Sequence, residues 1–394
     1  MKTHLNTLFV TTEGAYLAKS GKSVAVRTPD DDDTAPTKSK RSTKLRLPLH
    51  TLDGIVAFGR VSASPQLLAA AAEAGLTVSF LSPRGRFRYA AVGYSPGNVL
   101  LRRAQYRRAD DPHGTAEIAR SVLLGKLANS RTVMQRAARE SSDPKAAQAL
   151  ADAAAKLAAI VGDVRDGGWE NASDHASDRA GGRGSGPTPD EQSRPPSAPI
   201  PRGQSPADRL RGLEGGAAAC YFAAFDALLT PPRDPEGRLR FATRSRRPPL
   251  DPVNALLSFL YSLLTHDARS ACEAAGLDAA VGFLHRDRPG RPGLALDLIE
   301  ELRPVLADRV ACTLINRGQL TAGDFEQTAS GAVHLTDAAR RTVLAAWQRR
   351  KAEEVTHPYL GERMTWGLVP HIQARLLARF LRGELDAYPP FLRR

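Results

Sequence analysis

The sequence predicts an α+β protein in which a small N-terminal β-rich domain precedes a larger, all-α C-terminal domain. Three observations support this fold class. Short β-rich runs separated by Gly, Asp and Pro fill residues 1–95. From residue 96 onward, apolar residues recur mainly at helical spacing. With 394 residues, 42% of them hydrophobic, the chain is long enough for two domains with a substantial core.

The N-terminal domain is expected to contain several strands and one helix. We expect strands at residues 8–10, 23–26, 44–49 and 77–82. The helix has Ser64 as its N-cap and Pro65 at its first position, and Gly75 ends it. A polar loop with four consecutive aspartates spans residues 28–41, and a solvated loop is favoured there over a cation site.

The helical domain is expected in two parts. Residues 96–165 form its first part, with helices at 99–108, 115–140 and 144–164. Residues 166–206 are rich in Gly, Ser, Pro, Asp and Arg, and too poor in apolar residues to order themselves. We interpret this segment as a disordered insertion. The helical pattern resumes in residues 207–394, the part that carries the candidate site.

The charge balance indicates an anionic partner. Lys and Arg together number 55 against 42 Asp and Glu, which gives a net charge of +13 and a pI near 10.0. Such a surface attracts nucleic acid or an anionic membrane, although a basic surface that binds nothing is the alternative. No apolar run approaches the ~20 residues that span a bilayer, so we expect no membrane partner.

Cysteine usage and the N-terminus favour a cytoplasmic protein. The three cysteines lie far apart in apolar helical contexts, which is typical of buried reduced thiols and argues against a zinc site or a disulfide framework. They are Cys220, Cys272 and Cys312. The N-terminus lacks the charged and then apolar pattern of a signal peptide.

Candidate metal ligands lie in two segments of the C-terminal part. Residues 282–304 contain His285 and then Asp297 and Glu300, which share one helix face because they are three residues apart. Glu214 is a lone acid on an otherwise apolar helix, followed by small residues that would allow a close backbone approach. Buried carboxylates need a compensating cation, and a mixed imidazole and carboxylate set suits Mg²⁺ or Mn²⁺.

Spacing alone favours a simpler interpretation. In it, Glu214 is a surface acid, His285 is a hydrogen-bond donor in a loop, and the helix acids form ion pairs. The arginines available to Asp297 and Glu300 are Arg288, Arg291 and Arg303. Asp297 lies close enough to the helix start to stabilise the helix dipole without any ligand role.

Five segments together resemble one protein family. They are GLEGGAAACYF (212–222), RRPPLDPVNALLSFLYSLL (246–264), GFLHRDRPGRPGLALDLIEELRP (282–304), AVHLTDAARR (332–341) and YPPFLRR (388–394). With them the chain resembles the CRISPR-associated adaptation endonuclease, the integrase subunit of spacer acquisition, and is most similar to its type I-C branch. The resemblance covers nearly all of the chain outside residues 28–43 and 166–206.

The resemblance implies a set of site residues. The metal of the family is held by a glutamate, a histidine and an acid on the following helix, which correspond to Glu214, His285 and Glu300. Some members have Asp where Glu300 stands. Asp297 matches an acid that supports the site in relatives, and whether it ligates directly stays open. The family also implies the β-then-α fold, a homodimer, and assembly with the smaller second CRISPR adaptation protein.

The reaction implied by the resemblance is phosphoryl transfer on double-stranded DNA. The 3′-hydroxyl of a captured fragment attacks a phosphodiester at the edge of a CRISPR repeat, and water in its place gives an endonuclease. No covalent protein intermediate is required, so Ser258 and Tyr261 are not assigned as nucleophiles, and Tyr261 is expected to pack in the core. Two other functions remain open at this point: a non-catalytic DNA-binding assembly subunit, and a repair nuclease for branched DNA.

Basic residues near the candidate site are expected to contact DNA phosphates. Asn254 either supports the site or caps the helix that follows Asp251 and Pro252. The expected DNA-binding residues are Lys126, Arg131, Arg244, Arg246, Arg247, Arg286, Arg288 and Arg291.

Overall fold

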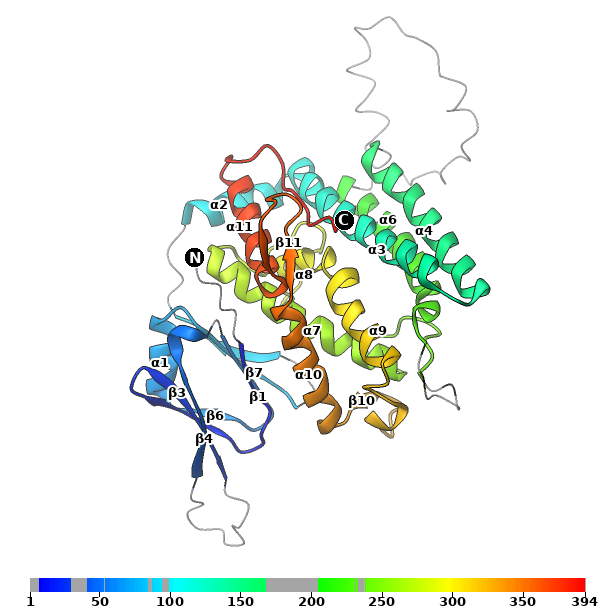
Figure 1. Cartoon of the computed structure of the whole chain (residues 1–394). Helices are drawn as coiled ribbons and strands as arrows, with labels where there is room; N and C mark the ends of the chain where they lie inside the picture. Colours follow the sequence, from blue (N-terminus) through cyan, green and yellow to red (C-terminus); the bar gives the residue numbers. More distant parts are fainter. Residues whose placement is uncertain are drawn as a thin grey trace, which may run out of the picture.

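The computed structural model describes residues 7–29, 41–52, 54–83, 87–93, 99–167, 205–230, 232, 237 and 239–393. Most of the predicted aspartate-rich loop and most of the predicted insertion lie outside these residues. A strand-rich N-terminal part and a mostly helical remainder are both present, as the α+β prediction required (Figure 1).

The N-terminal part contains two four-stranded sheets and one helix. The first sheet has the order β1-β5-β7-β8, with β8 antiparallel to the rest; its strands are β1 (Thr7–Val10), β5 (Gly54–Phe58), β7 (Thr77–Leu81) and β8 (Phe87–Ala91). The second sheet has the order β4-β3-β2-β6; its strands are β4 (Arg41–Pro48), β3 (Ser23–Pro29), β2 (Tyr16–Ser20) and β6 (Ser62–Ala63).

The predicted helix is α1 (Pro65–Glu73), and its boundaries have the expected causes. The Oγ atom of Ser64 accepts a hydrogen bond from the backbone N–H of Leu67 at 3.2 Å, and Pro65 opens the helix. Gly75 follows the last turn with a φ of 71°, a left-handed conformation that favours glycine. Local sequence therefore sets both ends of this helix.

Strand β5 belongs to two cores at once, because successive side chains of a strand point to opposite faces. Ile55 and Ala57 pack in the core between the N-terminal elements. Val56 and Phe58 pack in the core of the helical part, where the ring centroid of Phe58 lies 6.2 Å from that of Phe259. This run of buried residues joins the two parts of the molecule.

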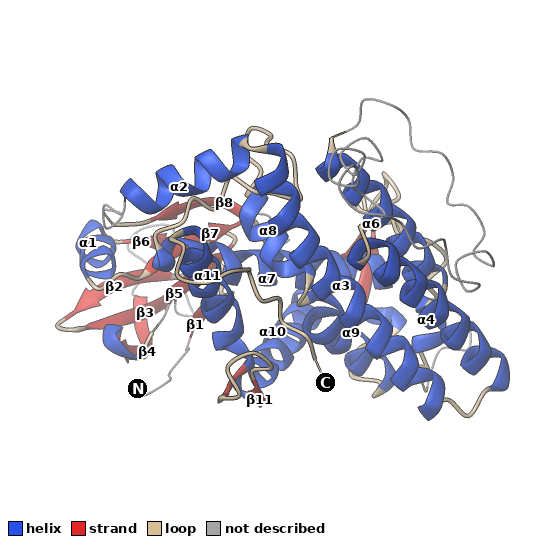
Figure 2. Cartoon of the chain, turned by 90° about the horizontal axis from the view of Figure 1, so that it is seen from above, coloured by secondary structure: helices blue, strands red, loops and turns tan. Residues whose placement is uncertain are grey.

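The helical part contains the three helices predicted in its first half and a further set after the insertion. They are α2 (Val99–Asp110), α3 (Pro112–Glu140), α4 (Pro144–Arg165), α6 (Pro206–Ala223), α7 (Pro252–Ala275), α8 (Gly293–Glu300), α9 (Asp308–Asn316), α10 (Asp337–Ala352) and α11 (Val369–Leu381). Viewed from above, the strands of the N-terminal part lie at one end of the molecule, and α4 and α6 lie at the other (Figure 2). None of the helices in the described part of the chain is long and apolar enough to cross a membrane.

Two short antiparallel strand pairs interrupt the helices and were not predicted. One joins β9 (Phe325–Gln327) to β10 (Val333–Leu335), and the other joins β11 (Glu354–Thr356) to β12 (Arg363–Thr365). Each strand has only three residues, too few to establish a period-two pattern in the sequence.

We predict that residues 168–204 are dispensable for folding. Replacing them with a Gly/Ser linker of about ten residues should preserve cooperative thermal melting. The replacement must keep Ser205, because its Oγ atom caps α6 at Asp208, and must also keep the first turn of that helix. A matched deletion that continues through the fully buried Leu210 should lower the melting temperature. Loss of cooperative melting in the shorter deletion would contradict the prediction.

Candidate metal and DNA site

Two of the three predicted ligands face the same lysine. Glu214 lies on α6, Glu300 is the last residue of α8, and Lys126 lies on α3. The Nζ atom of Lys126 lies 2.8 Å from Oε2 of Glu300 and also pairs with Oε1 of Glu214. The side chain of Glu300 is only 2% exposed, whereas that of Glu214 is 27% exposed. Residues distant in sequence thus converge on one ammonium group.

Asp297 organises the turn that precedes α8. Its carboxylate accepts hydrogen bonds from the backbone N–H groups of Phe283, Leu284 and His285, at 2.6, 3.0 and 2.9 Å. The same carboxylate lies 2.7 Å from Nδ1 of the His285 ring. A carboxylate beside one ring nitrogen, with the other nitrogen turned away from it, is the arrangement found behind metal-ligating histidines.

The turn requires a glycine where the backbone passes α8. A Cβ atom at Gly282 would lie 2.7 Å from the backbone carbon of Gly293 and 2.8 Å from Oδ2 of Asp297. Any side chain there would push the Asp297 carboxylate away from its donors. Glycines on α6 differ: a Cβ atom at Gly215 or Gly216 would meet nothing within 4 Å among the described residues. Among the described residues, then, no other segment comes close to these two glycines.

His285 reaches Glu300 across the end of α8. Its Nε2 atom lies 3.7 Å from Oε1 of Glu300. Asp297 and Glu300 both contact this histidine, so they share one helix face as their spacing predicts. The contact between Asp297 and Nδ1 of His285 therefore orients the ring so that Nε2 faces the buried carboxylate of Glu300.

Two cations keep Glu300 ionised. Burial alone would raise the pKa of this carboxyl, but the charges of Arg303 and Lys126 outweigh burial and lower the pKa to about 2. Arg303 contacts Oε1 of Glu300, and its guanidinium lies 4.7 Å from the ring centroid of Tyr261. The ion pair between Glu300 and Arg303 is the one that the simpler interpretation of the sequence offered.

The predicted ligands do not form a coordination shell among the described residues. In the part of the chain that the structure describes, no three His, Cys, Asp or Glu side chains are grouped closely enough to hold a metal ion. Lys126 lies between Glu214 and Glu300, and of these two glutamates it is Glu300 that His285 adjoins. The donors nevertheless suit a hard divalent cation: two carboxylates, one of them buried and ionised, and an imidazole nitrogen.

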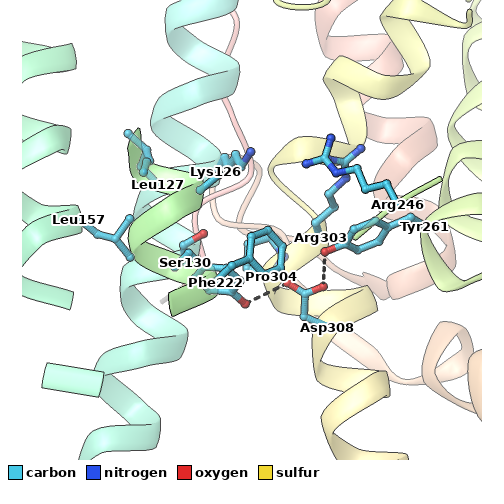
Figure 3. A pocket seen from close by; sticks show the side chains of 13 residues that line it. Lys126, Leu127, Ser130, Leu157, Phe222, Arg246, Tyr261, Arg303, Pro304 and Asp308 are labelled. Atoms are coloured by element: carbon cyan, nitrogen blue, oxygen red, sulfur yellow. Dashed lines mark hydrogen bonds between the residues drawn. The ribbon is translucent and has the colours of Figure 1, made fainter. Parts of the chain in front are cut away.

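A cavity adjoins the ligands and is lined by cationic and aromatic side chains (Figure 3). On its floor, Asp308 accepts hydrogen bonds from the hydroxyls of Tyr221 and Tyr261, at 2.9 and 2.7 Å. Tyr261 therefore does more than the core packing predicted for it. The cavity is lined by Lys126, Leu127, Ser130, Leu157, Ala217, Ala218, Tyr221, Phe222, Arg246, Tyr261, Arg303, Pro304 and Asp308.

Asn254 fixes the arginine-rich loop before α7. Asp251 caps that helix by accepting the backbone N–H of Asn254 at 2.8 Å. The Asn254 side chain accepts the N–H of Ser245 at 3.1 Å and donates to the carbonyl of Thr243 at 2.7 Å. Its role is therefore to hold the loop, while Asp251 is the residue that caps.

The predicted DNA-binding residues of this loop divide into two kinds. Arg244 is held inside: it donates to Oδ1 of Asn254 at 2.5 Å, and its guanidinium lies 5.5 Å from the ring centroid of Tyr261. Arg244 is thus engaged within the protein, and its predicted contact with DNA phosphate stays a prediction. Arg246 and Arg247 are exposed.

The loop arginines approach those that follow His285. Burial lowers the pKa of Arg291, and neighbouring positive charges lower it further; these neighbours include Arg288, Arg247 and Arg246. Arg286 pairs with Asp208 at 2.5 Å. Arg131 is exposed on α3, beyond Lys126. We refer to Arg246, Arg247, Arg288 and Arg291 as the arginine cluster.

Sequence reasoning found some contacts of the site and missed others. It offered Arg303 as a partner of Glu300, and the two stand three residues apart in one helical stretch. The Asp308 bridge between Tyr221 and Tyr261 gave no signal, because its partners lie 87 and 47 residues away. Lys126 was predicted to contact phosphate, but its two carboxylate partners were not predicted.

Comparison with known proteins identifies the family. The sequence matches the family described as CRISPR associated protein Cas1 over residues 8–181 and 189–349. The chain belongs to the Cas1 family. It is 45% identical over 392 residues to the CRISPR-associated endonuclease Cas1 1 of Chlorobaculum tepidum, covering 100% of this chain and 99% of that protein. It is 48% identical over 394 residues to the CRISPR-associated endonuclease Cas1 2 of Rhodospirillum rubrum, covering 99% of each.

Solved structures share the Cas1 fold at low sequence identity. A Cas1 protein from Thermotoga maritima superposes with a TM-score of 0.70 at 18% identity, over 96% of this chain and 97% of that one. A casposase bound to integration product gives a TM-score of 0.74 at 19% identity, over 99% and 95%. A Cas6-RT-Cas1–Cas2 complex gives 0.71 at 20% identity, over 99% of this chain and 36% of the matched one. The family match confirms the family resemblance inferred from the five segments, and the solved structures confirm the fold; the type I-C branch stays a prediction.

We predict that Asp308 makes stability fall as pH rises. Burial raises the pKa of Asp308 to about 6, whereas an unfolded Asp titrates near 3.8. Between these values the folded chain holds a proton that the unfolded chain has released, so raising the pH favours unfolding. Between pH 4 and 6.5, wild type should lose about 2–3 kcal/mol of unfolding free energy relative to Asp308→Asn.

Urea unfolding of both proteins across this pH range measures the difference. The difference is needed because Glu300, whose pKa is lowered, contributes stability with the opposite pH dependence. Parallel stability curves for wild type and Asp308→Asn would show that Asp308 does not titrate in this window.

Proposed function

We propose that this Cas1-family chain is a metal-dependent DNA endonuclease and integrase that inserts captured DNA fragments into a CRISPR array. The observation that carries the proposal is that Glu214 and Glu300, from two helices, share Lys126, and that His285 adjoins Glu300, near an arginine cluster. A protein that only bound DNA would gain nothing from ionised carboxylates where phosphates must approach.

We infer that Glu214, His285 and Glu300 hold one Mg²⁺ or Mn²⁺ ion. Asp297 acts as a positioning residue, since its carboxylate orients the His285 ring and the turn that carries it. When bound, the ion polarises the scissile phosphodiester and stabilises negative charge that develops on it. Glu300 is ready for this role because its flanking cations keep it ionised at any physiological pH.

The surrounding side chains position the DNA. Arginines pair with phosphate oxygens through two parallel N–H groups, so the arginine cluster suits a backbone passing the ligands. Arg286 and Arg131 are exposed and would add to this basic surface, and Arg244 supports the loop of Arg246 and Arg247 from within. A 3′-hydroxyl attacking the held phosphodiester joins two DNA molecules, whereas water in the same place cleaves one.

The partners follow from the reaction and the relatives. A captured double-stranded fragment with 3′ ends and a CRISPR repeat are the two DNA substrates. We propose that the chain works in the cytoplasm as a homodimer together with the smaller second adaptation protein, Cas2. Solved Cas6-RT-Cas1–Cas2 assemblies, in which the matched chain shares this fold, support that partnership.

We predict that loss of a proposed ligand abolishes chemistry but not DNA binding. His285→Ala and Glu300→Gln should each reduce nicking and strand transfer at least about a thousandfold, because the proposed ligand set is left incomplete. Asp297→Asn should cost about 10–100-fold, because it disturbs a ligand without removing it. Strand transfer is measured on labelled DNA in Mn²⁺ and in Mg²⁺, and DNA affinity by fluorescence anisotropy.

The matched control is Glu326→Gln, which neutralises an exposed glutamate on β9. It should behave as wild type in both assays. Wild-type turnover by either His285→Ala or Glu300→Gln would remove that residue from the catalytic set. If wild type itself binds DNA without nicking or joining it, the non-catalytic assembly subunit becomes the better description.

We also predict that the arginine cluster sets the salt dependence of DNA binding. Each of Arg246→Ala and Arg288→Ala should weaken binding evenly across DNA sequences and reduce the slope of log K against log[salt] by about one. The control, Arg363→Ala, removes an exposed arginine that pairs with Glu354 on another element. An unchanged slope in both cluster variants would show that DNA takes a different path.

A further inference from the structure

Lys126 is a charged group of the site that lies between two proposed ligands but is not itself one of them. Its ammonium lies between the carboxylates of Glu214 and Glu300, at the place where a shared cation would compensate both. The side chains of Lys126 and Glu300 are 13% and 2% exposed, so bulk water screens this pair little. The lysine therefore already supplies the positive charge that these carboxylates need.

A metal ion cannot bind Glu214 and Glu300 without a compensating change while Lys126 still pairs with both. The charged groups that act on the ammonium are Glu300, Glu214 and Arg303, so two carboxylates face two cations. A divalent ion on the same carboxylates, with Lys126 still between them, would leave two uncompensated positive charges. Such charge is costly in a space that is largely closed to water. Either the lysine leaves its partners or an anion joins the site.

The backbone of α3 cannot provide the movement. A Cβ atom at Gly125 would lie 2.9 Å from Cβ of Pro390 and 3.0 Å from Cβ of Glu301. One turn further along, Asn129 donates to the carbonyl oxygens of Glu301 and Phe391, both at 2.7 Å. The helix is thus fixed on both sides of Lys126, and only the flexible side chain is free to turn.

The adjoining cavity is the place toward which the Lys126 side chain can turn. Lys126 lines it together with Arg246 and Arg303, and Figure 3 shows these three cations around one space. The cavity itself has room for little more than water, and Asp308 also lines it, so a DNA phosphate would meet these cations at its mouth, where Arg246 is exposed. A lysine that leaves Glu214 and Glu300 is therefore close to an anion that compensates its charge.

We propose that Lys126 is the internal counter-ion of the metal site. It pairs with Glu214 and Glu300 before the metal binds, and it transfers to a DNA phosphate when the metal takes its place. Metal and DNA then strengthen each other's binding, since coupling between two ligands is reciprocal. This inference rests on the proposed function of the site.

The test is Mn²⁺ binding to full-length wild type and Lys126→Met, measured calorimetrically. DNA is absent or present as a duplex with 3′-deoxy ends, which cannot begin strand transfer. Without DNA, Lys126→Met should bind Mn²⁺ about tenfold more tightly than wild type, because no internal cation competes. Adding the duplex should tighten Mn²⁺ binding to wild type about tenfold and to Lys126→Met by much less.

Matched variants separate this competition from general charge and folding effects. Lys156→Met removes one positive charge from an exposed position on α4 and should bind Mn²⁺ as wild type does. Lys126→Gln replaces Lys126→Met if the latter does not fold. Unchanged or weaker Mn²⁺ affinity in the folded Lys126 variant overturns the inference.

The proposed metal site is checked separately with Glu300→Gln. If Glu300→Gln loses Mn²⁺ binding while the Lys126 variant binds as wild type does, the inference fails and the proposed site stands. If wild type and Glu300→Gln bind Mn²⁺ alike, the proposed site fails and the inference fails with it.

Discussion

The burial of an ionised carboxylate at Glu300 constrains everything around it. An isolated charge in the protein interior is too costly to persist, so the fold must bring cations to it. Arg303 comes from the same helical stretch, and Lys126 comes from a helix far away in sequence. Glu300 can stay ionised only if α3 packs against α8, because that packing places Lys126 beside it.

Glu301, the residue after Glu300, helps to hold α3 in this position. Glu301 points away from Glu300 and accepts the hydroxyl of Tyr388 at 2.7 Å and the N–H of Phe391 at 2.8 Å. Through Asn129, the same C-terminal segment is bonded to α3. Burial raises the pKa of Glu301 to about 7, in contrast to Glu300, because its partners are neutral. The two adjacent acids therefore have different roles. Glu300 supplies a buried negative charge to the proposed metal site, and Glu301 binds the C-terminal segment that is also bonded to α3, the helix of Lys126.

Local patterns predicted the elements and part of the site, but not its assembly. The cap at Ser64 and the shared face of Asp297 and Glu300 follow from spacing of three residues, which a sequence displays directly. Lys126 and Glu214 stand 88 residues apart, and only the packing of α3 against α6 brings them together. The contacts that hold Arg244 were not predicted, because the side chains involved, among them Asn254, Phe222 and Tyr261, belong to other elements or later turns. The assembly of the proposed ligand set itself stays a prediction.

Helix α7 links the strand-rich part of the molecule to this chemistry. On one face, Phe259 packs against Phe58 of β5, which alternation places in the helical core. On another face, Asn254 and Tyr261 hold Arg244, and the Tyr261 ring also lies against Arg303. Since Arg303 pairs with Glu300, a continuous run of contacts leads from the first sheet to the buried carboxylate. Displacing the sheet would therefore disturb the ligands through α7, although no strand contributes a residue to the proposed set.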